Sequence, residues 1–213
     1  MVEEAAQPVP EQPSSVTEAS IEMTPGLLLA RHAGQHLLLV LVTLGLYAAA
    51  DSWYILTGLG LALLLSIATA LLVGISVSTL IHEWFHLLGA RLSGGAYHIP
   101  AKSGLFVYDW HFAENNVRQF YKMSVAGSIG GALAVLLLWY ALPIVSPGRA
   151  AVLAGAVASF VFAAVIEWPV LSRTRSSGDP LAELSKITPR VLLRALIAGT
   201  AAGGLILLSG HSG

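Results

Sequence analysis

The chain contains no cysteine, and only 11% of its 213 residues are charged. Without cysteine there is neither a disulfide framework nor a thiolate metal ligand, which leaves histidine and carboxylate side chains as the strong ligands available. Soluble domains carry about 25% charged residues, whereas 55% of this chain is hydrophobic. The composition therefore indicates an integral membrane protein.

The sequence also lacks basic clusters interleaved with aromatic residues, so nothing in it indicates nucleic-acid binding. Residues 1–25 contain five glutamates and four prolines but no lysine or arginine. This composition is typical of a solvated, disordered tail, and it lacks the basic start of a secretory signal. We therefore expect a disordered acidic, proline-rich tail over residues 1–25 and a polytopic membrane domain over residues 26–213.

Five apolar runs predict five transmembrane helices, which makes the expected fold class an all-α membrane protein. The second run exceeds the ~20 residues that a crossing needs, so its helix must tilt or protrude. A tight turn is expected at residues 51–53, and two short extended stretches, 95–100 and 105–108, are expected in the connection after the second run. The expected spans are residues 36–50, 55–92, 125–144, 150–171 and 189–208, with a short amphipathic piece at 180–187.

The basic residues orient these spans. Of the eleven lysines and arginines, all but Arg149 fall on the side that the N-terminus shares with the connections at residues 93–122 and 172–179. The positive-inside rule then predicts that this side, with the end of the second helix, is cytoplasmic. The ten residues are Arg31, Arg91, Lys102, Arg118, Lys122, Arg173, Arg175, Lys186, Arg190 and Arg194.

An H-E-x-x-H pattern at residues 82–86 ends the second apolar run. Residues four apart on a helix lie about 40° apart in azimuth and roughly 6 Å apart along the axis, so His82 and His86 can bind one ion. Glu83 lies about 100° round the helix, where it can reach an activated water without being a ligand. The alternative is that these groups are only polar contacts between packed helices.

Catalytic zinc usually takes three protein ligands and one water, so two histidines need a partner. Spacing alone does not choose among the acidic and histidine side chains on the same side. Glu167 is one candidate because an intramembrane carboxylate is a functional candidate by default. The full set is His98, Asp109, His111, Glu114, Glu167 and Asp179.

Three pieces of the chain resemble the site-2 protease family, the intramembrane zinc metalloproteases. The H-E-W-F-H segment at 82–86 resembles its first signature. The V-A-G-S-I-G-G segment at 125–131 resembles its Ala-Gly-Pro-Leu-Ala-Asn stretch, although Ser128 stands in place of the proline and Gly131 in place of the asparagine. The segment at 177–189 resembles the aspartate-containing segment of short bacterial members, with Pro180 in place of glycine. Together these pieces cover roughly residues 56–189.

The resemblance implies a zinc ion held by His82, His86 and Asp179, with Glu83 as the general base. It implies hydrolysis of a peptide bond in or near a transmembrane segment of a membrane-protein substrate, within the lipid bilayer of the bacterial inner membrane. It also implies that the extended stretches after the second span hold an unwound substrate by strand addition. Asp179 is also well placed to cap a short helix starting at Pro180, and the two roles can coexist.

Two other functions are compatible with parts of the sequence. A membrane di-iron oxygenase would use the H-x-x-x-H spacings at 32–36 and 82–86, but such sites need about eight histidines and the chain has seven. A non-catalytic membrane scaffold would bind partner helices, but it has no physical need for Glu83 beside two histidines.

Overall fold

The computed structural model describes residues 24–102 and 104–209, and these residues form an integral membrane protein of the expected all-α class. Five of the helices in this part of the chain are long and apolar enough to cross a membrane. They are α1 (Pro25–Thr57), α2 (Gly60–Leu92), α3 (Val117–Ala141), α4 (Pro147–Ser177) and α6 (Pro189–Ser209). The shorter elements are β1 (Tyr97–His98), β2 (Asp109–Trp110) and α5 (Pro180–Leu184).

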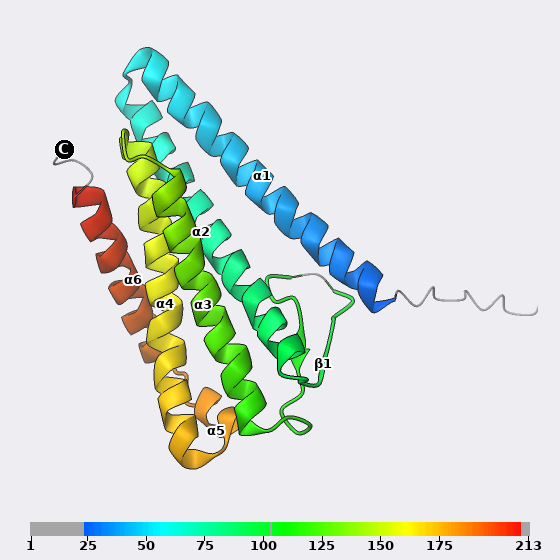
Figure 1. Ribbon diagram of the computed structural model, residues 1–213. Helices are drawn as coiled ribbons and strands as arrows, with labels where there is room; N and C mark the ends of the chain where they lie inside the picture. The colour runs from blue at the N-terminus through cyan, green and yellow to red at the C-terminus, as the bar shows by residue number, and fades with distance from the viewer. Residues whose placement is uncertain (1–23, 103, 210–213) are drawn as a thin grey trace, which may run out of the picture.

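Helix α2 is central, since it packs against α1, α3 and α4, and α4 also packs against α6. Helix α1 inclines away from the bundle toward its own N-terminal end (Figure 1). The connection between α2 and α3 lies beside that end of α1 (Figure 1). The end of α2 that carries residues 82–86 therefore has helices on one side and this connection on the other.

The first span is longer than the sequence indicated, and the prediction of a turn at residues 51–53 is wrong. Helix α1 continues through these residues to Thr57, and the chain turns at Gly58, whose φ of 65° is left-handed. Asp51 is tolerated inside the helix because its carboxylate accepts a hydrogen bond from the Ser66 hydroxyl of α2 at 2.7 Å. Of the expected tail, residues 1–23 lie outside the described residues; Thr24 caps α1 and Pro25 begins it.

The connection after α2 contains a small antiparallel hairpin, in which His98 pairs with Asp109 and Tyr97 with Trp110. The second strand was expected within residues 105–108 but lies at Asp109–Trp110. Residue 103, between the two expected stretches, lies outside the described residues. Asn115 fixes the base of the hairpin, since its side chain bonds both the N–H and the C=O of Ala96 at 2.7 Å. The residues after β1 are drawn instead toward α1, where side chains bind their carbonyls.

Small residues allow the helix backbones to approach closely, as is usual in membrane bundles. A Cβ at Gly74 of α2 would collide with the Val152 carbonyl of α4, and one at Gly155 of α4 would collide with the Leu71 carbonyl of α2. Each helix thus has a glycine where the other's backbone passes. These contacts fix the distance between α2 and α4.

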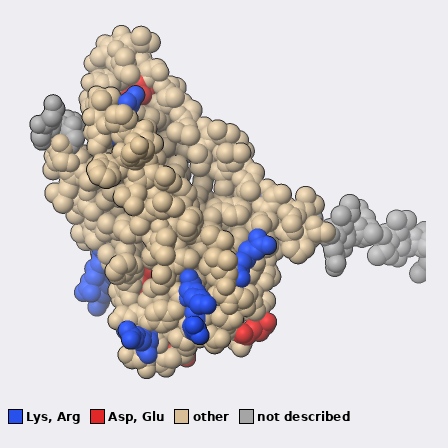
Figure 2. All heavy atoms as spheres, viewed as in Figure 1, with Lys and Arg blue, Asp and Glu red and all other residues tan. Residues whose placement is uncertain are grey.

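Lysine and arginine side chains gather at the end of the molecule that holds α5 and the hairpin (Figure 2). There, Glu183 of α5 is buried, at 3% exposure, between Lys186 Nζ at 2.7 Å and Arg173 Nε at 2.9 Å. The ammonium of Lys186, helped by the Arg173 guanidinium, holds the pKa of the Glu183 carboxyl below its ordinary value. These ion pairs fasten α5 to the end of α4.

The approach of α2 and α4 can be tested by replacing Gly74 with alanine. The added methyl group would overlap the α4 backbone, so we expect a loss of about 1 to 3 kcal/mol in stability. Thermal unfolding in detergent micelles, followed by circular dichroism, measures this loss. Gly45→Ala is the matched control, because a Cβ there meets no atom within 4 Å. Equal melting temperatures for the two variants would contradict the proposed contact.

Candidate metal centre

Helix α2 places the imidazoles of His82 and His86 against each other inside the bundle. Their Nε2 atoms are 2.9 Å apart, and their ring centroids are 4.4 Å apart. Both residues are buried, at 6% and 8% exposure. The four-residue spacing therefore brings two ligand-type nitrogens to one point, as predicted.

Helix α4 brings Glu167 to the same point. Its Oε1 atom lies 2.8 Å from His82 Nε2 and 3.2 Å from His86 Nε2. Among the described residues, His82, His86 and Glu167 are the one group of three histidine or acidic side chains close enough to share a metal ion. The third member comes from a residue 81 positions after His86.

The three atoms are close enough to share one ion. Their separations are 2.8, 2.9 and 3.2 Å, and an ion bound about 2.0 to 2.1 Å from each nitrogen or oxygen fits between them. His86 Nδ1 lies 3.0 Å from the Met123 carbonyl, which can only accept a hydrogen bond. Nδ1 therefore carries the proton and Nε2 keeps its lone pair for the cluster, the usual arrangement for a ligating histidine.

Two side chains orient the Glu167 carboxylate. The Ser128 hydroxyl of α3 donates to Glu167 Oε2 at 3.4 Å, and Trp168 Nε1 donates to the Ser128 oxygen at 3.2 Å. Oε2 is thus occupied, and Oε1 is left to face the histidines. Two residues beyond Glu167, Pro169 lies inside the helix and supplies no N–H to the backbone ladder.

Glycines of α3 make room for the histidines. A Cβ at Gly127 would overlap the His86 ring, and one at Gly131 would lie 3.4 Å from His82 Nδ1. Gly130 makes room for Phe85, because a methyl group added at Gly130 would lie 2.5 Å from the Phe85 Cβ atom. The glycines of the 125–131 segment therefore act in packing, and two of them border the cluster.

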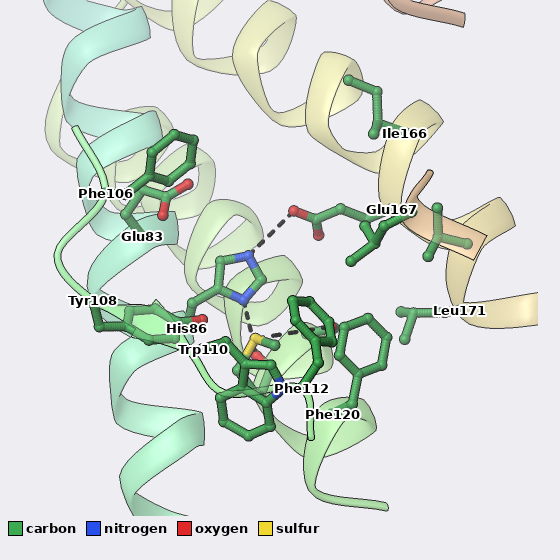
Figure 3. Close-up of a pocket in the computed structure, with 14 residues that line it drawn as sticks. Glu83, His86, Phe106, Tyr108, Trp110, Phe112, Phe120, Ile166, Glu167 and Leu171 are labelled. Carbon is green, nitrogen blue, oxygen red and sulfur yellow. Dashed lines mark hydrogen bonds and ion pairs between the residues drawn. The ribbon is translucent and has the colours of Figure 1, made fainter. Parts of the chain in front are cut away.

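Glu83 lies beside the cluster without belonging to it. Its side chain is 9% exposed, and no hydrogen bond or ion pair joins its carboxylate to another described residue. It lines the same cavity as His86 and Glu167, and Figure 3 shows it on the side near Phe106. A carboxylate in this position is free to accept a proton from a group in the cavity.

The cavity next to the cluster has a volume of about 380 Å³. The hairpin connection forms one wall with aromatic side chains, and α3 and α4 form the other (Figure 3). Apart from Glu83, His86, Glu167, Ser124 and the Tyr108 hydroxyl, its lining is apolar. The apolar lining residues are Phe106, Trp110, Phe112, Phe120, Met123, Ile166, Val170, Leu171 and Leu184.

Asp179 is not brought to the histidine pair. Its Oδ1 accepts a hydrogen bond from the Ala182 N–H at 3.0 Å, so it caps α5. The cap lies at the far end of α4, beyond Ser177, whereas Glu167 lies within α4 beside the imidazoles. The capping role foreseen in the sequence is thus observed, and the carboxylate at the cluster is Glu167.

His32 and His36 of α1 hold the hairpin connection in place. His32 Nε2 lies 3.1 Å from the Pro100 carbonyl, and His36 Nε2 lies 2.9 Å from the Gly104 carbonyl. His36 Nδ1 accepts a hydrogen bond from Trp84 Nε1 at 3.0 Å. Both histidines are buried, and neither belongs to the cluster at His82.

From the sequence alone, Ser128 had no expected role at the site, and Tyr108 was expected only as part of the 105–108 stretch that holds substrate. Glu167 itself had a signal, namely an ionisable group within an apolar span. Ser128 had a weaker one, since it stands where the resembling family has proline. The Tyr108 hydroxyl had none, because only the folded connection carries it to the cavity.

Comparisons with known proteins identify no relative. No protein-family model, no curated protein and no solved structure matches the chain.

Metal analysis of purified variants tests which carboxylate completes the centre. Glu167→Ala should lose one equivalent of bound metal relative to the wild type after dialysis, because the buried histidine pair then has one ligand fewer. Asp179→Asn keeps the helix cap and should retain the wild-type metal content. Loss of zinc from Asp179→Asn with retention in Glu167→Ala, measured by inductively coupled plasma mass spectrometry, would reverse the assignment.

Proposed function

We propose that this protein is an intramembrane zinc metalloprotease. The observation that carries the proposal is the His82–His86–Glu167 cluster inside a bundle of membrane-spanning helices, next to the Glu83 carboxylate, which bonds to no other described residue. Ionisable groups within a membrane are costly and mark functional sites. Two histidines and a glutamate are a ligand set of catalytic zinc in peptidases.

The ligand set and the open side of the cluster support a catalytic rather than a structural ion. Structural zinc sites are closed by four protein ligands, whereas catalytic sites leave one position for water. Three protein ligands are present here, and the cavity adjoins them. A zinc ion held there would lower the pKa of its water toward ~7 and polarise the scissile carbonyl.

Glu83 is proposed as the general base. Its carboxylate accepts the proton of the attacking water and passes it to the leaving amine. Because no other described residue bonds this carboxylate, both oxygens are available for proton transfer. The backbone of α2 fixes its position relative to the two histidines next to it in sequence.

Tyr108 is proposed to stabilise the negative charge that develops on the carbonyl oxygen. It lines the cavity with Glu83 and Glu167, and Figure 3 shows it beside His86. Burial, with the negative charges of Glu83 and Glu167, raises the pKa of its hydroxyl above the ordinary value. The hydroxyl therefore keeps its proton and can donate it in a hydrogen bond to an oxyanion.

The cavity lining supports an apolar substrate that is a transmembrane segment of another protein. A substrate helix satisfies its own backbone hydrogen bonds, so cleavage requires local unwinding. The hairpin next to the cavity offers extended backbone to which an unwound segment can add as a strand. The ten basic residues at this end favour a cytoplasmic location for the site by the positive-inside rule.

The site-2 protease resemblance is consistent with this proposal. One position at which this chain differs from the family, Ser128, contacts the carboxylate that we propose as the third ligand. Ser128 replaces the family's proline and donates to Glu167, the carboxylate at the cluster. We infer that this chain uses Glu167 where the short bacterial members use aspartate. The bacterial inner membrane is the location that the resemblance implies.

The di-iron oxygenase alternative receives no support from the geometry. His32 and His36 bond backbone carbonyls and an indole, so they are not available beside His82 and His86. A non-catalytic scaffold would not need the Glu83 carboxylate, whereas a protease needs it as the general base.

Replacing Glu83 with glutamine separates a protease from a scaffold. Glu83→Gln should lower the rate of peptide cleavage by about 10²- to 10⁴-fold, because the general base is lost, while the zinc content stays that of the wild type. The assay uses protein reconstituted in vesicles with a panel of single-span peptides, and mass spectrometry detects the products. Equal cleavage by both proteins would reject the mechanism, and peptide binding without cleavage by either would favour a scaffold.

Replacing Tyr108 with phenylalanine tests the role of its hydroxyl. Tyr108→Phe should lower kcat by about 10²- to 10³-fold, as loss of an oxyanion donor does, with zinc content and KM little changed. Tyr97→Phe is the matched control, since Tyr97 packs against Tyr108 at a ring distance of 5.8 Å but does not line the cavity. A KM effect without a kcat effect would assign Tyr108 to substrate binding instead.

A further inference from the structure

The hairpin carries a second histidine pair, separate from the cluster in the bundle. His98 Nδ1 lies 3.0 Å from His111 Nε2. The other nitrogen of each ring faces a carboxylate, with His98 Nε2 3.0 Å from Asp109 Oδ2 and His111 Nδ1 3.0 Å from Glu114 Oε1. The four side chains thus form one continuous row at the surface of the protein.

With both imidazoles neutral, this row has one proton fewer than its three hydrogen bonds need. An ionised carboxylate only accepts, so His98 Nε2 and His111 Nδ1 must carry the N–H groups. A neutral imidazole has one N–H, which leaves two lone pairs facing each other at 3.0 Å between the rings. Three hydrogen bonds need three protons, and two neutral imidazoles supply two. A cation between the rings completes the arrangement.

The arrangement suits a metal ion. A ligating histidine commonly donates its second N–H to a carboxylate, which fixes the ring and raises the basicity of the ligating nitrogen. Here both rings are held in this way. The side chains of His98 and His111 are 55% and 37% exposed, so water can complete the coordination of an ion held by two nitrogens.

The hairpin holds the pair in position before any ion binds. His98 and Asp109 are direct partners in the strand pair. The Asn115 side chain donates to the His111 carbonyl at 2.8 Å and to the Ala96 carbonyl at 2.7 Å, and the His111 N–H donates to the Ala96 carbonyl at 3.2 Å. The backbone on both sides of the pair is therefore fixed.

We propose that His98 and His111 bind a second divalent transition-metal ion, with Asp109 and Glu114 orienting the rings. Imidazole ligands select zinc, copper or nickel over magnesium or calcium. The hairpin also carries Tyr108 and Trp110 at the cavity wall, so an ion at this site would brace that wall. The proposal does not depend on the proteolytic function.

Metal stoichiometry tests the proposal. Tag-free protein in detergent is stripped of metal and titrated with Zn²⁺ at pH 7.5 by isothermal calorimetry. The wild type should bind two equivalents. His98→Gln and His111→Gln should each bind one, and Glu167→Ala should keep the hairpin equivalent. Asp109→Asn should weaken that equivalent by about 10- to 100-fold, as loss of an orienting carboxylate does.

Copper provides a second readout that is independent of activity. Cu²⁺ bound to a variant with His82→Ala and His86→Ala, which lacks the buried pair, should show hyperfine coupling to two imidazole nitrogens by electron paramagnetic resonance, and the two-nitrogen coupling should disappear when His111→Gln is added. Melting temperatures without metal check that the hairpin variants fold. Identical zinc stoichiometry in the wild type and both hairpin variants would overturn the proposal, and the pair would then share only a proton.

Discussion

The close approach of helices α2, α3 and α4 is the constraint on which the rest of the structure depends. Gly74, Gly127 and Gly155 lie where a side chain would strike a neighbouring backbone or the His86 ring. In lipid, association of helices relies on such contacts because there is little hydrophobic gain in bringing apolar surfaces together. The same approach brings Glu167 within hydrogen-bond distance of two imidazoles from another helix. Packing and the polar cluster are therefore two results of one arrangement.

The polar groups inside the bundle form a chain of contacts that is centred on Glu167. The carboxylate faces the histidines with one oxygen and Ser128 with the other, and Trp168 completes the row. On the opposite side of the cavity, the connection after α2 contributes aromatic side chains and is itself tied to α1 by His32 and His36. The cavity is thus lined by α2, α3, α4, α5 and the connection after α2.

The sequence predicted the membrane class, the number of spans and the histidine pair, because hydrophobic runs and helical spacing are local properties. It misplaced the end of α1, since Asp51 is polar in sequence but is satisfied by Ser66 from the next helix. It also could not choose between Glu167 and Asp179 from spacing. That choice depends on which carboxylate the packing of α2 and α4 carries to the imidazoles, and no local pattern encodes this distance.

The two unnamed positions of the H-E-x-x-H pattern have specific neighbours in this protein. The indole of Trp84 donates to His36 and so determines which nitrogen of that ring holds the hydrogen, while Phe85 fills the space left by Gly130. These two aromatic residues connect α2 to α1 on one side and to α3 on the other. The letters written as x are therefore the residues that fit the H-E-x-x-H pattern to the neighbouring helices of this bundle.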